Sequence, residues 1–286
     1  MRILVTGGAG YFGTQFTLTM MQLFQQHTVC IYSRDEAKHA KLRDQLAGLP
    51  DGTINRVRFF TGDVRDKDRL RRAMDGVNWV VHAAALKRIE VCEYDVQEVV
   101  KTNVVGSMNV IEAAFDAGVE KVVGLSTDKA CDPINAYGAS KMMMEKMFLA
   151  ANNSRGENGP IFAVTRYGNV AGSTGSVIPY FRELIARGVD VLPVTVKGCT
   201  RFYMTVEEAV DLVIGTLETM HGGELVVPKW LPAYEITDLA TAMDKQYRLT
   251  GLRPGEKVHE TMAPGLTSDK ARRMTIEELR QELEVV

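Results

Sequence analysis

A tyrosine and a lysine four residues apart give this sequence its clearest chemical signal. Tyr137 and Lys141 close the segment STDKACDPINAYGASK, which begins at Ser126. Residues four apart share one face of a helix, so the Lys141 ammonium is expected beside the Tyr137 phenol, where it favours the ionised form. A free phenol has a pKa of ~10 and needs such help to act as a general base at neutral pH. The alternative is a surface pair that occurs by chance.

The first residues, MRILVTGGAGYFGTQF, are typical of a strand, a tight turn and a helix. An apolar run precedes glycines at Gly7, Gly10 and Gly13, and a helical pattern follows them. Glycines permit positive φ and the close approach of a pyrophosphate, and a helix N-terminus offers free N–H groups. This context predicts a dinucleotide site.

The end of the second expected strand indicates which dinucleotide binds. An NAD-selective protein usually has Asp or Glu there, whereas this chain has Ser33 and Arg34. A hydroxyl and a guanidinium can both bind a 2′-phosphate, so NADP is favoured over NAD. Asp35 and Glu36 follow directly and are the alternative ribose ligands. Lys38 adds positive potential, or is only part of a solvated helix face.

Strand-like runs alternate with segments of helical length, which predicts an α/β fold with a doubly wound parallel sheet of the Rossmann type. The runs are Ile3 to Val5, Val29 to Tyr32, Val57 to Phe60, Trp79 to Ala83, Lys121 to Leu125 and Ile161 to Thr165. Ligands bind such sheets at the carboxyl ends of the strands. The predicted cofactor contacts are Gly7, Gly10, Tyr11, Phe12, Gly13, Ser33, Arg34, Lys38, Asp63, Val64, Ala83, Ala84, Ala85, Tyr137 and Lys141.

Composition argues against several classes of protein. With 286 residues, 45% of them hydrophobic, the chain can bury a large core. A net charge of -2 without a basic cluster argues against nucleic acid as a partner. No apolar run is long enough for a membrane span or a signal peptide, so we expect a cytoplasmic protein. The cysteines and histidines are scattered without metal-binding spacing, so we expect no metal.

The pattern loosens after about Asn169 into short strands and helices with glycine- and proline-rich joints. We therefore expect a smaller C-terminal substrate-binding domain. Residues 1–168 should form the NADP-binding Rossmann domain, completed by about 201–219, and 169–286 should form mainly the cap. The last amphipathic helix, expected at 275–284, packs within the protein or faces another subunit.

In these motifs the chain resembles the extended short-chain dehydrogenase/reductases, and among them the inverting UDP-N-acetylglucosamine 4,6-dehydratases that start pseudaminic acid and related sugar pathways. The Asp-Lys pair of STDKA is the most specific feature, because dTDP-glucose 4,6-dehydratases typically carry Asp-Glu there and simple epimerases carry neither. The resemblance covers nearly the whole chain through TGGAGYFG, YSRDE, GDVRD, HAAALK, KTNVVGSMNV, STDKA, YGASK, RYGNVAGSTGSVIPYF, TRF and LRPGEKVHE.

The resemblance implies NADP-dependent dehydration of UDP-N-acetylglucosamine to a UDP-4-keto-6-deoxy-N-acetylhexosamine with inversion at C5. Tyr137 would accept the proton of the 4-hydroxyl as hydride leaves C4, with Lys141 holding the phenolate and the nicotinamide ribose. Lys129 would remove the C5 proton, and Asp128 would protonate the departing 6-hydroxyl before hydride returns to C6. Thr127 would hydrogen-bond the sugar near its 4-oxygen.

A lysine acts as a base only when it is neutral, and its reference pKa is ~10.4. We expect burial, together with repulsion from Lys141 and the oxidised nicotinamide, to lower the pKa of Lys129. An ionised Asp128 would raise it instead. We therefore expect Asp128 to be protonated in the reactive state, as a general acid must be.

The substrate contacts that the resemblance implies are Lys87, Asn169, Val177, Arg201, Arg253 and Glu256. The two arginines suit a diphosphate, and the glutamate suits a sugar or ribose hydroxyl. Each arginine has a structural alternative, because arginines in loops often cap helices or pair on the surface. The family places Asn169 and Val177 near the diphosphate and uracil, and Lys87 facing the sugar.

Two departures from the family pattern lie near the expected substrate. Thr174 stands where relatives usually have arginine, and the loop RIEVCEYDVQE after Lys87 lacks the common proline. These departures bear on the precise sugar or nucleotide more than on the chemistry. The alternative functions are a UDP-sugar 4-epimerase, a retaining 4,6-dehydratase, or a non-catalytic NADP-binding regulatory protein. Relatives are dimers or larger, so a homo-oligomer is expected.

Overall fold

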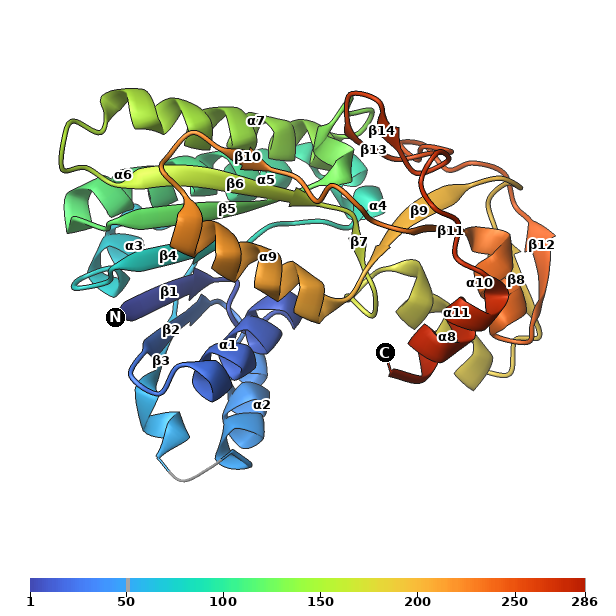
Figure 1. The fold of residues 1–286 in the computed structure, drawn as a ribbon, viewed down its shortest axis with the longest axis horizontal. Helices are drawn as coiled ribbons and strands as arrows, with labels where there is room; N and C mark the ends of the chain where they lie inside the picture. Colours follow the sequence, from blue (N-terminus) through green and yellow to red (C-terminus); the bar gives the residue numbers. More distant parts are fainter. Residues whose placement is uncertain (50–51, 286) are drawn as a thin grey trace.

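A seven-stranded sheet, parallel throughout, forms the centre of the larger lobe (Figure 1). The computed structural model describes residues 1–49 and 52–285. The strand order is β10-β6-β5-β4-β1-β2-β3. All six expected strands are confirmed, and so is the doubly wound α/β fold. The strands are β1 (Arg2–Thr6), β2 (Thr28–Ser33), β3 (Val57–Thr61), β4 (Trp79–His82), β5 (Lys121–Thr127), β6 (Ile161–Tyr167) and β10 (Leu225–Val226).

Helices cover both faces of this sheet (Figure 1). Those of one face are α1 (Tyr11–Leu23), α2 (Glu36–Ala47) and α9 (Val206–Thr219). Those of the other are α3 (Lys67–Ala73), α6 (Gly106–Ala117) and α7 (Ala136–Ala151). Separate apolar cores form on the two faces, around Phe16 and Val213 on one and around Val110 and Phe148 on the other. No helix in the described ranges is long and apolar enough to cross a membrane.

Short helical segments connect the main elements. After β4 the chain forms α4 (Ile89–Tyr94), α5 (Val96–Val99) and a π-helix, η2 (Val100–Val105), which runs into α6. The 3-10 turns are η1 (Thr53–Arg56), η3 (Asp128–Ala130) and η4 (Asn152–Ser154). Both η2 and η3 border the site described below. Such tighter or wider helical turns are frequent at functional sites in proteins.

The chain returns to the larger lobe late in the sequence. The helix α9 packs against α1, β5 and β6, and β10 pairs in parallel with β6. The expected return at 201–219 therefore falls on α9, whereas β9 (Thr200–Met204) belongs to the smaller lobe. The division of the chain into two domains stays a prediction.

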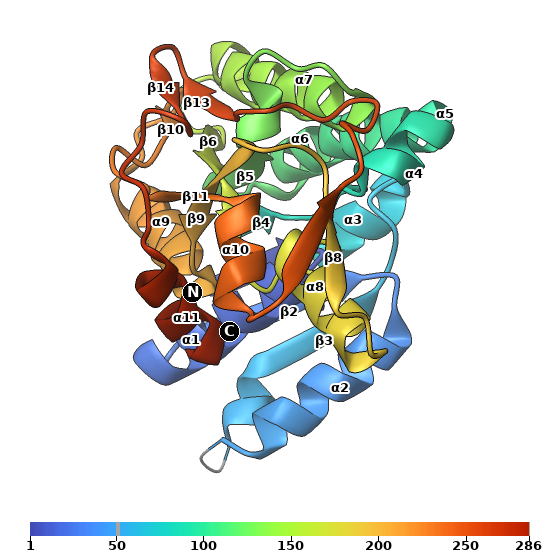
Figure 2. The ribbon, with the colours of Figure 1, turned by 90° about the vertical axis from the view of Figure 1, so that its right-hand side faces the viewer.

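The smaller lobe contains three small sheets and three helices, and it faces the viewer in Figure 2. Its core includes Phe181, Leu239 and Leu279. Because Leu279 of α11 is buried in this core, the last helix packs within the lobe. The elements are β7 (Asn169–Val170), β8 (Val191–Val194), β9, β11 (Ala233–Glu235), β12 (Gln246–Leu249), β13 (Thr261–Ala263), β14 (Leu266–Thr267), α8 (Val177–Ala186), α10 (Ile236–Ala242) and α11 (Ile276–Val285).

A buried ion pair of the larger lobe holds an arginine that also reaches β13 of the smaller lobe. Arg166 donates from Nε and a terminal nitrogen to the two carboxylate oxygens of Glu145, at 2.8 and 2.6 Å. Its other terminal nitrogen donates to the carbonyl of Met262 at 2.8 Å. Ser126 adds a bond to Glu145 at 2.6 Å. A bidentate pair fixes geometry as well as charge, so β13 is held at the carboxyl ends of β5 and β6.

Candidate active site

The turn after β1 needs glycine at two of the three predicted positions. Gly7 has φ +68°, and a Cβ there would lie 2.9 Å from the Ala84 amide nitrogen. A Cβ on Gly13 would lie 2.5 Å from the Cα of Gly8, so α1 packs directly on the turn. Gly10 precedes the first residue of α1. The turn therefore leaves the open backbone at a helix N-terminus that a pyrophosphate requires.

Tyr11 and Phe12 follow this turn in the first turn of α1. The Tyr11 hydroxyl donates to the carbonyl of Ala171 at 2.9 Å, which links α1 to the start of the smaller lobe. The Phe12 ring stacks on Phe16, with centroids 5.9 Å apart. Both side chains border the glycine turn, and both already have partners within the protein.

The end of β2 gathers the predicted 2′-phosphate ligands. The Ser33 hydroxyl lies 2.6 Å from Nε2 of His39, and Arg34, half exposed, lies 3.5 Å from Asp63. Asp35 accepts from the Lys38 backbone N–H and caps α2. Its carboxylate also pairs with the Lys38 ammonium at 3.3 Å. Asp35 is thus engaged as a helix cap. Ser33 and Arg34 therefore remain as the predicted 2′-phosphate ligands at this strand end.

Asp63 has two arginine partners, since Arg65 also pairs with it, at 2.7 Å. Burial raises the pKa of Asp63, but the hydrogen bonds from Arg65 and the charge of Arg34 outweigh burial and hold it below its usual value. The carboxylate is therefore ionised at neutral pH. It is a hydrogen-bond acceptor at the end of β3.

The ends of β1 and β4 meet beside the glycine turn. The Ala83 N–H donates to the Thr6 carbonyl at 3.1 Å, and the Ala84 N–H to the Thr6 hydroxyl at 3.3 Å. On the same side of the sheet, a Cβ on Gly106 would lie 2.7 Å from Val64. The glycine turn, the exposed cation after β2 and these strand ends together fit a nicotinamide dinucleotide.

Asn103, which sequence reasoning missed, ties the loop after β4 to α7. Its side chain accepts from the Leu86 N–H and donates to the Leu86 carbonyl, both at 2.8 Å. It also donates to the Ser140 hydroxyl at 2.9 Å. Asn103 thereby fixes the backbone between Ala85 and Lys87. It belongs to the π-helix η2, whose geometry no sequence pattern indicates.

Tyr137 and Lys141 lie in the first two turns of α7, but their charges differ from the prediction. Burial raises the pKa of Tyr137 to about 12, with Lys129 and Thr127 lowering it in part. Burial lowers the pKa of Lys141 to about 8, opposed only by Glu145. The pKa of Tyr137 in the free protein is therefore raised rather than lowered, and the groups that lower it in part are Lys129 and Thr127 instead of the expected Lys141. Lys141 itself is only 4% exposed.

Asp128 and Lys129 form a buried charge cluster with Glu260. The Lys129 ammonium lies 3.0 Å from Asp128 Oδ1, 3.0 Å from Glu260 Oε1 and 3.2 Å from Asn169 Oδ1. Asp128 is 0% exposed, and Thr127 donates to its Oδ1 at 3.0 Å. The second oxygens of Asp128 and Glu260 are buried and have no partner among the described residues. The segment after β5 therefore contributes two members of a close group of ionisable side chains in the site.

This cluster sets the pKa values of its members. Burial and the charge of Glu260 raise the pKa of Asp128, with Lys129 opposing them, as a general acid requires. Burial lowers the pKa of Lys129, but Asp128 and Glu260 more than offset it, so its pKa is raised. The expected lowering is therefore wrong for the free protein. Sequence reasoning did not assign Glu260, although this residue ends the quoted motif LRPGEKVHE.

Three predicted substrate ligands form one chain of ion pairs. Arg201 is buried and lies 2.9 Å from Glu256, and Arg253 lies 3.2 Å from the other oxygen of Glu256. Arg253 also pairs with Glu90 of α4 at 2.6 Å. Arg201 lies 3.7 Å from Glu260, so the chain connects to the charge cluster. In the free protein these arginines are paired rather than open.

Of the remaining predicted substrate ligands, Asn169 contacts this cluster directly. Asn169 accepts from Lys129, and Val177 is the first residue of α8. Lys87 lies at the exposed end of the β4 loop. Partial removal of its ammonium from water lowers the pKa of Lys87, and repulsion from Lys129 lowers it further, which places the two lysines near each other.

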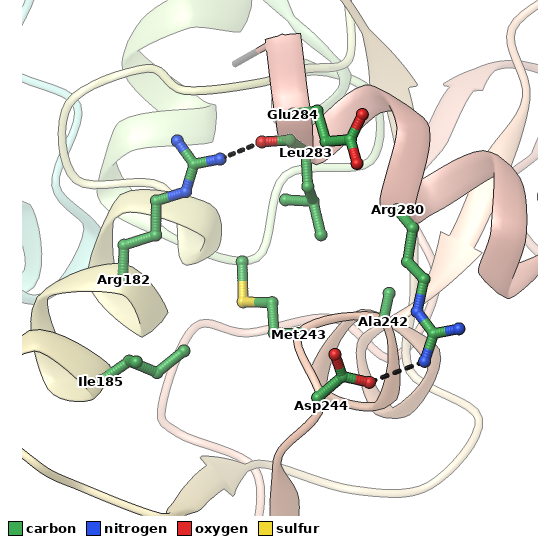
Figure 3. A pocket seen from close by; sticks show the side chains of 8 residues that line it. All are labelled: Arg182, Ile185, Ala242, Met243, Asp244, Arg280, Leu283 and Glu284. Carbon is green, nitrogen blue, oxygen red and sulfur yellow. Dashed lines mark hydrogen bonds and ion pairs between the residues drawn. The ribbon is translucent and has the colours of Figure 1, made fainter.

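A separate hollow of about 360 Å³ lies between α8, α10 and α11 (Figure 3). Arg182 donates to the Leu283 carbonyl on one side, and Arg280 pairs with Asp244 on another. None of the predicted site residues lines it. Its lining is Arg182, Ile185, Ala242, Met243, Asp244, Arg280, Leu283 and Glu284. Within residues 1–49 and 52–285, no group of metal-binding side chains gathers, and the expected absence of a metal stays a prediction.

Known proteins resemble this chain over almost its whole length. A family model described as "Polysaccharide biosynthesis protein" matches residues 3–280. UDP-N-acetylglucosamine 4,6-dehydratase (inverting) of Campylobacter jejuni is 47% identical over 262 residues, covering 91% of this chain and 76% of that protein. UDP-glucose 4-epimerase of Rickettsia conorii is 39% identical over 278 residues, covering 94% and 79%. The X-ray structure of Pen from Bacillus thuringiensis has a TM-score of 0.91 at 31% identity and covers 100% and 98%.

The depressed pKa of Lys141 predicts a pH-dependent cost to stability. Between pH values of about 8 and 10.5 the unfolded chain binds this proton and the native chain does not, so stability rises with pH. Below about pH 8 the buried charge costs stability in full. We expect Lys141→Met to raise the free energy of unfolding at pH 7 by ~1–3 kcal/mol, and by less at pH ~9.5.

Urea unfolding of the cofactor-free protein at both pH values measures this difference. Lys146→Met, which changes an exposed lysine of the same helix, is the matched control and should show no such pH dependence. A Lys141→Met protein less stable than wild type at pH 7 would contradict the assignment of a buried, unfavourable charge.

Proposed function

This chain belongs to the polysaccharide biosynthesis protein family of extended short-chain dehydrogenase/reductases, and we propose that it dehydrates UDP-N-acetylglucosamine to a UDP-4-keto-6-deoxy-N-acetylhexosamine with inversion at C5. The observation that carries the proposal is the buried pair Asp128 and Lys129 at the end of β5. Oxidation at C4 needs only a tyrosine and lysine pair. Elimination of water across C5 and C6 needs a further acid and base, and this pair supplies both types of group.

The two lobes divide the binding in this proposal. Residues 1–168, completed by α9 and β10, hold NADP through the glycine turn, Ser33 and Arg34. Residues 169–286 mainly hold the UDP-sugar. A bound nicotinamide would supply the acceptor for the C4 hydride and the donor of the hydride to C6. Lys141 lies buried where it can bind the ribose and support the Tyr137 phenolate.

The protein's own groups then move the protons. Tyr137 accepts the proton of the 4-hydroxyl, and Thr127 hydrogen-bonds the same oxygen. Asp128 is fully buried and burial raises its pKa, which suits a group that gives a proton to the departing 6-hydroxyl. Its unpartnered Oδ2 leaves one oxygen free to carry that proton. Lys129 removes the proton from C5.

Substrate binding in this proposal exchanges partners within an existing network. Arg201 and Arg253 are both held by Glu256 in the free protein. A diphosphate can replace this carboxylate on the arginines, which frees Glu256 for a hydroxyl of the sugar or ribose. Asn169 and Val177 line the nucleotide side, and Lys87 faces the sugar.

The second candidate is a UDP-sugar 4-epimerase, which the 39% identity to the Rickettsia conorii protein favours. In that reaction Asp128 and Lys129 have no elimination role. The burial of these two ionisable groups beside each other then lacks a chemical reason, because buried ion pairs are weak sources of stability. Homo-oligomerisation stays a prediction.

Incubation with UDP-N-acetylglucosamine in deuterated water tests the proposed reaction directly. We expect the product to have lost water and to carry deuterium at C5, because a protein group that exchanges with solvent reprotonates this carbon. NMR of the product reports both features together with the C5 configuration. A 4-epimer without C5 deuterium would identify the epimerase instead, and retained C5 configuration would refute inversion.

Lys129→Ala should separate oxidation from elimination. The change leaves Tyr137 and Lys141 in place, so C4 oxidation continues while removal of the C5 proton slows by about 100-fold or more. Stopped-flow absorbance should then show reduced nicotinamide accumulating. Lys87→Ala, the neighbouring lysine without the base role, should dehydrate without such accumulation. Normal dehydration by Lys129→Ala would refute its role.

Arg34→Gln should weaken NADP selectively. Loss of one exposed charged hydrogen bond should raise the dissociation constant for NADP by about tenfold and leave that for NAD nearly unchanged. Calorimetric titration of cofactor-stripped protein with each dinucleotide measures both. Lys38→Gln is the matched control and should have the smaller effect. Tighter binding of NAD than NADP by the wild type would overturn the cofactor assignment.

A further inference from the structure

Glu260 is an ionisable residue of the site that the proposed reaction has not yet used. It lies just before β13, is only 2% exposed, and places Oε1 3.0 Å from the Lys129 ammonium. Its backbone N–H donates to the Ser268 hydroxyl at 2.9 Å, which fixes its position. Arg201 is its other close cation, at 3.7 Å. The carboxylate is thus built into the site from the smaller lobe.

We propose that Glu260 is a positioning residue that takes the ammonium proton of Lys129 and so produces the free amine that attacks the C5 proton. This inference rests on the dehydration proposed above. It answers a problem of protonation, because Lys129 lies between two carboxylates and its own pKa is raised. An ammonium has no lone pair, so it must lose a proton before it can act as a base.

The two carboxylates beside Lys129 are not equivalent. Asp128 must hold a proton for the leaving hydroxyl, so it cannot also accept one from Lys129. Burial raises the pKa of Glu260, but Lys129 and Arg201 outweigh burial and lower it, so Glu260 rests as an anion. Its Oε2 is buried and has no partner among the described residues, so the charge depends on nearby cations, chiefly Lys129 and Arg201.

Substrate makes this transfer easier. An ion pair loses its solvation when bound substrate excludes water, whereas a neutral acid and amine lose much less. The charged groups that face Glu260 are Lys129, Arg201, Asp128 and Lys257. A diphosphate that engages Arg201 would withdraw positive charge from Glu260 and favour its protonation further.

The protons balance through one turnover. Lys129 breaks an N–H bond and Glu260 gains an O–H bond. The amine then takes the C5 proton while the C5–H electrons form the C5–C6 double bond, the C6–O bond breaks, and Asp128 protonates the leaving hydroxide. After hydride addition at C6, C5 gains a proton from a solvent-exchanging group on the face opposite Lys129, as inversion requires. Water restores that group's proton, Lys129 stays an ammonium, and Glu260 releases its own proton to water. Asp128 has then lost one proton and Tyr137 has gained one. The Thr127 hydroxyl hydrogen-bonds both groups, so it can pass the proton from Tyr137 back to Asp128 and complete the cycle.

Glu260→Gln tests the proposal, because it keeps the shape and the bonding oxygen but cannot accept the proton. The two possible roles of Glu260 give opposite results. If Glu260 only holds Lys129 as an ammonium, removing the charge lowers the pKa of Lys129 and elimination is unchanged or faster. If Glu260 accepts the proton, elimination slows by roughly 100-fold at neutral pH although the pKa of Lys129 falls.

Two measurements read these outcomes. Lysine side-chain NMR of the ligand-free protein, with Lys129 identified by its loss in Lys129→Arg, should show its pKa falling in Glu260→Gln. Stopped-flow absorbance should show reduced nicotinamide accumulating at neutral pH and elimination recovering as pH rises through the new pKa of Lys129. A variant with a purely structural defect would not recover at high pH.

Glu256→Gln is the matched control, since it removes a carboxylate from Arg201 that does not contact Lys129. It should raise KM without accumulation of reduced nicotinamide. Elimination by Glu260→Gln at or above the wild-type rate, or equal loss of oxidation and elimination at every pH, would overturn the inference. Failure of the wild type to form a 4-keto-6-deoxy product would instead refute the dehydration on which the inference rests.

Discussion

The buried ammonium of Lys129 is the charge on which the rest of the site depends. It is held by Asp128 from the end of β5 and by Glu260 from the smaller lobe, at 3.0 Å each. A buried charge is tolerated only with such partners, so the two lobes must meet at this point. Arg166, fixed by its pair with Glu145, bonds to Met262 and so holds β13 near the carboxyl ends of β5 and β6. Proton chemistry and lobe packing therefore share one location.

The two lysines of the site show how burial alone does not decide protonation. Lys141 is buried with only Glu145 to support its charge, and its pKa falls to about 8. Lys129 is also buried, yet two adjacent carboxylates raise its pKa. Lys141, whose positive charge is weakly supported, suits binding of the ribose and of the Tyr137 phenolate. Lys129 requires a proton acceptor before it can work as a base, and this gives Glu260 a chemical purpose.

The arginines on the substrate side of the site are already paired with carboxylates of the protein. Arg201, Glu256, Arg253 and Glu90 form a continuous chain that reaches Glu260. Binding of an anionic substrate would exchange partners along this chain rather than fill open cation sites. The network therefore connects substrate recognition to the charge cluster where elimination is proposed.

The sequence by itself determined the six main strands, the glycine turn and the positions of Asp128, Lys129, Tyr137 and Lys141, because these follow from local periodicity and short motifs. Ser33 and Arg34 were placed at the end of β2 for the same reason. Only the tertiary structure decided which pKa values rise and fall, that Arg201 and Arg253 share Glu256, and that Glu260 faces Lys129. Those features are contacts between segments far apart in the chain, and no local pattern encodes the distance between two such side chains.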